Sequence, residues 1–132
     1  MDRSVSQHML RDPRRIAIVD DDAPLRVALA RLVTALGFEA RTYESGSSFI
    51  ADAHTVPFER ALLDQNMPGQ SGLEVVELLR SIKLNIPAII ITCSDDPNIA
   101  LECTKRNIPF LKKEHLTEAL PGALDAYSGA TS

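Results

Sequence analysis

The feature that most constrains the fold is an alternation of short apolar runs with amphipathic segments. Residues 16–19 and 88–91 are uninterrupted apolar runs, as expected of strands that helices cover on both faces. Between such runs, apolar residues recur at helical spacing, and the first set is Leu25, Ala28, Leu29, Leu32, Val33 and Leu36. Parallel strands need crossover connections, which are usually helices. The alternation therefore predicts an α/β fold, doubly wound around a five-stranded parallel sheet.

The other elements follow in the same order. We expect further strands at residues 38–43, 61–63 and 108–112, and helices at residues 47–53, 98–106 and 116–127. A helix after Gly72 presents an inward face made of Leu73, Val76, Leu79 and Ile82. Asp22 caps the first helix, Pro24 fits its first turn, and Gly37 ends it. Pro121 is expected to interrupt the last helix, because an internal proline costs about 3 kcal/mol.

Length and charge limit the function further. The 132 residues suit one domain, which we place at residues 14–128, with a flexible polar arm at 1–13 and a tail at 129–132. The formal charge of −4 argues against nucleic acid and anionic membranes as partners. No apolar run reaches the roughly 20 residues of a membrane span. Cys93 and Cys103 are interpreted as free thiols in a reducing compartment, so we expect a cytoplasmic protein.

Polar residues follow four of the five predicted strands. They are Asp20, Asp21 and Asp22 after the first strand, Asp64 after the third, Thr92 after the fourth and Lys113 after the fifth. Each alone has a plain structural explanation as a cap, a turn residue, a strand end or a surface charge. In open parallel sheets, however, ligands bind beyond the carboxyl ends of the strands. We therefore expect these side chains to converge on one site.

The residue types at these strand ends indicate phosphoryl chemistry. Crowded carboxylates repel one another, so the cluster needs a lysine, a divalent cation or both. Oxygen ligands favour Mg²⁺, which usually binds one or two carboxylates together with waters and phosphate. A carboxylate is also a nucleophile toward phosphorus, and a cation with a lysine neutralises the charge on the transferring group. Thr92 would donate a hydrogen bond to a phosphoryl oxygen.

These segments resemble the receiver domain of two-component response regulators. The matching strings are Ile18-Val19-Asp20-Asp21-Asp22 with Pro24-Leu25-Arg26, then Leu63-Asp64-Gln65-Asn66-Met67-Pro68 with Ser71-Gly72, then Ile86-Pro87 leading to Thr92, and finally Phe110 three residues before Lys113. The resemblance covers about residues 14–127. It implies a flavodoxin-like fold with strand order 2-1-3-4-5.

The resemblance also implies a role for each matching position. Asp64 would be the phosphoacceptor, and Thr92 and Lys113 would bind the phosphoryl group. The implied Mg²⁺ ligands are Asp64, Asp21, the backbone carbonyl of Asn66, and Asp20 either through a water or as a second carboxylate ligand. Phe110 would be the aromatic side chain that rotates on activation.

Two departures from the family pattern lie near the end of the chain. The family usually has a cis proline after the lysine, whereas Glu114 follows Lys113 here. A cis bond before a non-proline residue costs about 3 kcal/mol, so we expect a trans bond and a different loop. Pro121-Gly122 is the second departure. Both lie on the face of the fourth helix, fifth strand and fifth helix, through which the family contacts output domains or forms homodimers.

The leading hypothesis is a phosphorylation switch. A sensor histidine kinase or histidine phosphotransfer protein would phosphorylate Asp64, and a downstream protein partner would read the change. The chain would catalyse only its own phosphorylation and dephosphorylation, so it is not expected to be an enzyme. The alternatives are a phosphorylation-independent adaptor and the receiver fragment of a longer transcriptional regulator. A phosphatase acting on outside substrates is disfavoured, because neither a catalytic base nor a substrate cap is visible.

Overall fold

A computed structural model describes residues 14–93 and 96–129 of the chain, without the side chains of 126–129. The expected arm at 1–13 and most of the expected tail lie outside the described residues. The elements in chain order are β1 (Arg15–Val19), α2 (Ala23–Ala35), β2 (Glu39–Tyr43), α3 (Gly46–Ala53), β3 (Arg60–Asp64), α4 (Gly72–Ser81), β4 (Ala88–Thr92), α5 (Pro97–Lys105), β5 (Phe110–Lys112), the 3₁₀ turn η1 (Lys113–His115) and α6 (Leu116–Gly129).

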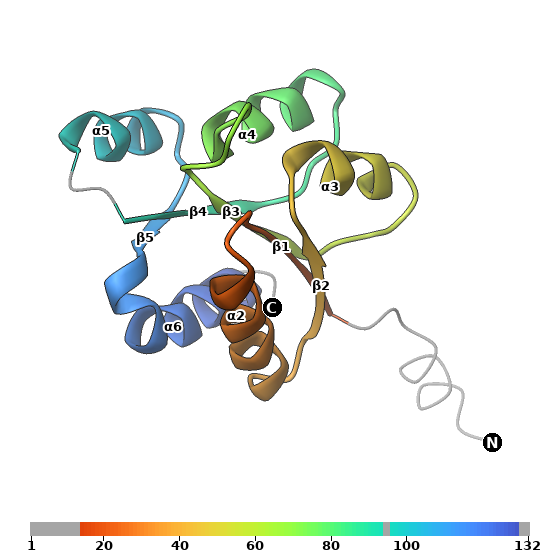
Figure 1. Ribbon diagram of the computed structural model, residues 1–132, viewed down its shortest axis with the longest axis vertical. Helices are drawn as coiled ribbons and strands as arrows, with labels where there is room; N and C mark the ends of the chain where they lie inside the picture. Colours follow the sequence, from red (N-terminus) through yellow and green to blue (C-terminus); the bar gives the residue numbers. More distant parts are fainter. Residues whose placement is uncertain (1–13, 94–95, 130–132) are drawn as a thin grey trace.

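The five strands form one sheet in the order β2-β1-β3-β4-β5, and every neighbouring pair is parallel. Helices α3, α4 and α5 cover one face of the sheet, while α2 and α6 cover the other (Figure 1). The expected doubly wound fold and its strand order are confirmed.

Two apolar cores, one on each face, explain the uninterrupted apolar runs. On β1, Ile16 and Ile18 pack with the core under α2 and α6, while Ala17 and Val19 pack with the core under α3, α4 and α5. All four side chains are fully buried. Because successive side chains point to opposite faces, a strand covered on both sides has no polar position.

Local hydrogen bonds fix where the helices begin. Asp22 accepts a hydrogen bond from the Leu25 N–H at 3.4 Å, as expected of the cap of α2. At α4, Ser71 and Glu74 form a capping box, in which each side chain accepts a hydrogen bond from the backbone N–H of the other residue. Gly37 follows α2 with a positive φ of 97°, in agreement with its expected role at the end of the helix.

Three residues expected on inward helix faces are exposed instead. Ile82 is 37% exposed and Leu36 is 36% exposed, because each stands one residue past the end of its helix, where the helical period no longer applies. Ala28 is also exposed, since α2 packs mainly through the larger side chains beside it. On α4 the buried position that the pattern missed is Val75.

The expected interruption at Pro121 is wrong. Helix α6 runs through this residue without a break. Leu116, Leu120 and Leu124 recur at every fourth position and are at most 5% exposed. Burying a leucine contributes about 1.5–3 kcal/mol, so three of them outweigh the roughly 3 kcal/mol that an internal proline costs.

The chain around β5 also differs from the simple expectation. Strand β5 begins at Phe110 rather than at residue 108, because Asn107 has a left-handed φ of 56° and Pro109 has no N–H to donate. No cis peptide bond occurs in the described chain, which agrees with the trans bond expected at Glu114. Instead of a proline loop, the chain passes directly from β5 into η1 and α6.

Candidate functional site

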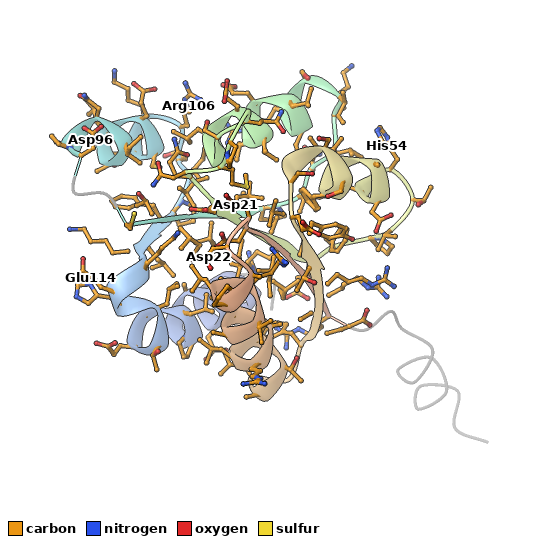
Figure 2. The ribbon with its side chains drawn as sticks, viewed as in Figure 1. Asp21, Asp22, His54, Asp96, Arg106 and Glu114 are labelled. Atoms are coloured by element: carbon orange, nitrogen blue, oxygen red, sulfur yellow. The ribbon has the colours of Figure 1, made fainter. Side chains whose placement is uncertain are left out.

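The predicted site residues lie at the carboxyl edge of the sheet. Asp20 directly follows β1, Asp64 ends β3, Thr92 ends β4, and Lys113 directly follows β5. The strand register aligns these ends, since Asp64 pairs with Ile91 and Thr92 pairs with Lys112. Figure 2 shows Asp21 and Asp22 at the start of α2, at the same edge.

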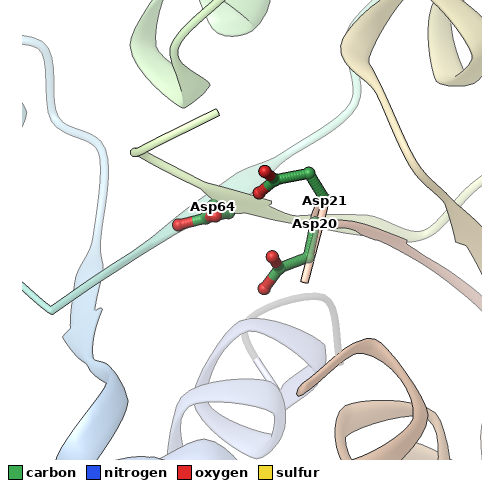
Figure 3. Close-up of side chains that lie close together, drawn as sticks. All are labelled: Asp20, Asp21 and Asp64. Carbon is green, nitrogen blue, oxygen red and sulfur yellow. The ribbon is translucent and has the colours of Figure 1, made fainter. Parts of the chain in front are cut away.

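Three carboxylates meet at this edge. One oxygen from each of Asp20, Asp21 and Asp64 lies within 4.8 Å of the other two (Figure 3). Asp20 and Asp64 are 1% and 2% exposed, whereas Asp21 is open to solvent. The cluster is therefore a largely buried negative site with one accessible side, a combination that requires positive charge nearby.

Lys113 supplies part of that positive charge. Its Nζ lies 3.3 Å from Oδ1 of Asp64, and its side chain is 22% exposed. Burial by itself opposes the charged ammonium, but the carboxylates of Asp64 and Asp20 raise the pKa of Lys113 above its ordinary value. The lysine is therefore held positive beside Asp64.

The surroundings of the Asp20 carboxylate indicate that the site needs a further positive charge. Its Oδ1 accepts the N–H of Asp22 at 2.9 Å, but its buried Oδ2 has no hydrogen-bond partner among the described residues. Burial raises the pKa of Asp20 to about 6, the Asp22 N–H offsets part of this shift, and the charge of Asp64 adds to it. An orphaned buried carboxylate oxygen is costly in a folded protein. This donor set fits a hard divalent cation, which favours oxygen ligands.

The backbone around Asp64 is fixed by close contacts. Oδ1 of Asp64 accepts the N–H of Asn66 at 3.2 Å. Gln65 is buried, and its side-chain oxygen accepts the N–H of Leu73 at 3.0 Å. Gly72 lies so close that a Cβ added there would stand 2.8 Å from the carbonyl oxygen of Asp64. The start of α4 is thus packed directly against the residue that carries the central carboxylate.

Sequence reasoning missed two residues that support the site. One is Gln65, whose position beside Asp64 gave no sign that its amide would be buried. The other is Arg26, whose Nη1 donates to the backbone carbonyl of Asp20 at 2.7 Å. Arg26 lies six residues after Asp20, in the first turns of α2, and helical spacing could have placed it near the strand end.

The remaining candidates lie close to the site in different ways. Thr92 is 1% exposed at the end of β4. Asn66 is exposed, and its side-chain amide lies 3.7 Å from Sγ of Cys93. Phe110 is partly buried and packs against the core under α3, α4 and α5, with Ile90 as its neighbour in register. Its role as a rotating aromatic residue stays a prediction.

Chemically, this arrangement can hold a cation and present a carboxylate to an electrophile. Asp64 combines a carboxylate nucleophile with an adjacent ammonium, and Asp20 and Asp21 provide the acidic side of a cation site. These are the parts needed to form and break an acyl phosphate.

Within the described residues, no helix is both long and apolar enough to cross a membrane.

Comparisons with known proteins agree with this geometry. The family model described as response regulator receiver domain matches residues 16–125. The chain is 36% identical over 99 residues to the transcriptional regulatory protein FixJ of Rhizobium meliloti, covering 74% of this chain and 48% of that protein. It is 34% identical over 119 residues to the response regulator protein TmoT of Ectopseudomonas mendocina, covering 89% and 54%. The chain thus spans about half the length of these relatives.

Solved structures show the same fold. The crystal structure of FixJ-N superposes with a TM-score of 0.81 at 32% identity, covering 90% of this chain and 96% of that one. The Vibrio cholerae chemotaxis protein CheY4 superposes with a TM-score of 0.79, covering 88% and 99%, and at 24% identity it supports the fold alone.

Proposed function

The chain belongs to the response regulator receiver family of two-component systems, and on that basis we propose that Asp64 is the residue that accepts the phosphoryl group. The observation that carries the proposal is the contact of 3.3 Å between Lys113 Nζ and a carboxylate that is 2% exposed and lies within 4.8 Å of two further acids. Receiver domains work with histidine kinases. The donor would therefore be a phosphohistidine on a sensor kinase or on a phosphotransfer protein.

The chemistry is a transfer between a nitrogen and an oxygen. The N–P bond of the phosphohistidine breaks as an O–P bond to the Asp64 carboxylate forms, and water later attacks phosphorus to release inorganic phosphate. Lys113 would pair with the phosphoryl oxygens, and the Thr92 hydroxyl would donate a hydrogen bond to one of them. The chain thereby catalyses reactions on itself and is not a conventional enzyme.

We further propose that the acidic cluster binds Mg²⁺. Asp21 and Asp64 would be direct carboxylate ligands, the Asn66 carbonyl would be a third ligand, and Asp20 would act through a water or as a second acid. Mg²⁺ favours oxygen ligands and usually binds one or two carboxylates together with waters and phosphate. One oxygen from each of the three carboxylates lies within 4.8 Å of the other two, so one ion could be held by this set. When bound, the ion supplies neutralising charge to the transferring phosphoryl group.

The output is proposed to be a change in protein binding. Phe110 would follow Thr92 on phosphorylation, and the surface of α5, β5 and α6 would engage a downstream protein or a second copy of the chain. We expect no direct contact with nucleic acid or membrane from these residues, and a cytoplasmic setting. Because the named relatives are about twice as long, a place within a longer transcriptional regulator is the second candidate.

The experiment is phosphorylation by a small donor. The protein is incubated with acetyl phosphate and Mg²⁺, and its intact mass is measured. We expect one phosphate adduct in the wild type, none in Asp64→Asn, and none when the metal is chelated. Asp125→Asn is the matched control, because Asp125 is an exposed acid on α6. An adduct that survives in Asp64→Asn would refute the assignment. Absence of any adduct in the wild type would favour a phosphorylation-independent adaptor.

A further inference from the structure

A cavity lies at the edge of the sheet opposite to Asp64. Its volume is about 300 Å³, and it forms where α4 and the connectors at residues 82–87 and 106–109 meet the beginning of β3. Apolar side chains such as Leu79, Leu84 and Ile108 form much of its wall. Arg60 is the first residue of β3, so the four residue steps of the strand separate the cavity from Asp64 by about 13 Å.

The walls of the cavity are held in place before any ligand binds. Both connectors end in a proline, and the carbonyl oxygens of Pro87 and Pro109 accept backbone hydrogen bonds of 2.9 Å from β3 and β4 respectively. Arg106, which Figure 2 labels between α4 and α5, forms an ion pair of 3.0 Å with Glu77 on α4. A cavity whose walls are already ordered binds a ligand at low entropic cost.

The charge on the cavity wall is positive. Arg60 and Arg80 both line the cavity, and no acidic side chain is among the described residues that line it. The Arg60 side chain is only 5% exposed, and its Nη2 lies 3.9 Å from Glu59. Arg80 is exposed, and its Nη2 donates a hydrogen bond of 3.2 Å to the backbone carbonyl of Arg106. Because water is largely excluded around Arg60, its attraction for an anion is stronger than that of a surface arginine.

The size of the cavity limits the anion. At about 30 Å³ for each water-sized group, 300 Å³ holds roughly ten non-hydrogen atoms. This is too small for a nucleotide and too apolar for free phosphate. Guanidinium groups pair well with planar carboxylates, and the aliphatic wall suits a compact hydrocarbon body.

We propose that this cavity is a second ligand site, and that it binds a small monocarboxylate with a compact apolar body, of about the size of benzoate. Arg60 and Arg80 bind the carboxylate, and the wall around Leu79 and Ile108 contacts the hydrocarbon. The site is independent of the acidic cluster and does not require phosphorylation of Asp64.

The probe is benzoate, titrated into ¹⁵N-labelled protein and followed by amide chemical shifts. We expect saturable shifts at Asn85, Ala88 and Asn107, and none at Asp20 or Asp64. Benzamide has the same shape without the charge, and we expect it to bind at least about tenfold more weakly, because a hydrogen bond to a charged group is lost.

Variants test the two arginines. Arg80→Met and Arg60→Met should each weaken benzoate binding at least about tenfold, while Arg31→Met, at an exposed position on α2, should leave binding unchanged. If Arg60→Met does not fold, Arg80→Met decides, because its side chain is exposed and its loss spares the core. The proposal is overturned if benzoate gives no saturable shift, if its shifts centre elsewhere, or if benzamide binds equally well.

Discussion

Replacing Gly72 with alanine should destabilise the domain and impair phosphorylation at the same time. The added Cβ would lie 2.8 Å from the carbonyl oxygen of Asp64 and 3.1 Å from Cδ1 of Ile90. Ile90 is a core residue of β4, and the Asp64 carbonyl is part of the β3 backbone, so neither neighbour moves freely. Forcing an extra methyl group into such a space costs about 1–3 kcal/mol.

The same change brings a smaller gain in helix propensity. Alanine is favoured over glycine by at most about 1 kcal/mol inside a helix, and less at the first position of α4. The net expectation for Gly72→Ala is a loss of about 1–2 kcal/mol of unfolding free energy. Phosphorylation by acetyl phosphate should slow severalfold, because a small displacement of a nucleophile has a large effect on rate.

Gly122→Ala is the matched control. Gly122 lies inside α6, and a Cβ there would meet no atom within 4 Å. The same substitution should therefore stabilise the domain, by about 0.5–1 kcal/mol, and leave phosphorylation unchanged. Urea unfolding at equal protein concentration measures both variants. The reasoning about the contact with Asp64 is refuted if Gly72→Ala is as stable as the wild type and is phosphorylated at the same rate.

Three further predictions test other contacts. Burial is the main cause, and the hydrogen bond of 2.7 Å to Asp52 the second, that raises the pKa of Tyr43 to about 12. The protonated Tyr43 side chain should therefore stabilise the folded domain fully below the unfolded-state pKa near 10, and this contribution should be lost as pH rises to 12. Urea unfolding across that window should show a smaller alkaline loss in Tyr43→Phe than in the wild type, and equal losses would contradict this view. Asp20→Asn removes a buried charge beside Asp64, so in the presence of a chelator its melting temperature should be higher than that of the wild type. Added Mg²⁺ should raise the melting temperature of this variant less than that of the wild type, and an equal rise would argue against a role for Asp20 in binding the ion. Pro121→Ala restores a helix N–H and should stabilise the domain by about 1–2 kcal/mol in urea unfolding, whereas a loss would show that the proline is favourable where it stands.

The fold could be predicted from the sequence because it depends on a strong and simple signal. Runs such as residues 88–91 have no polar position, and only a strand covered on both faces places every side chain in a core. The convergence of Asp20, Asp64, Thr92 and Lys113 followed from topology alone, because the carboxyl ends of parallel strands share an edge. No side-chain packing had to be known for either inference.

What could not be predicted depends on packing in three dimensions. The burial of Gln65 depends on the path of the chain between β3 and α4, and the helix through Pro121 depends on three leucines meeting the sheet. The burial of the Arg60 guanidinium could not be predicted either, because an arginine at the start of a strand is usually solvated. Sequence spacing does not contain this information.

The departure at Glu114 has a structural consequence for how the site connects to the rest of the domain. Lys113 contacts Asp64 and is also the first residue of η1, so the 3₁₀ turn begins at the same residue that contacts the Asp64 carboxylate. A 3₁₀ turn rises about 2 Å per residue, which places Leu116 roughly 6 Å further along. Leu116 is 5% exposed and belongs to the core under α2 and α6. The residue that contacts Asp64 and the core-anchored start of α6 therefore lie within a single turn of each other, with the exposed Glu114 and His115 between them.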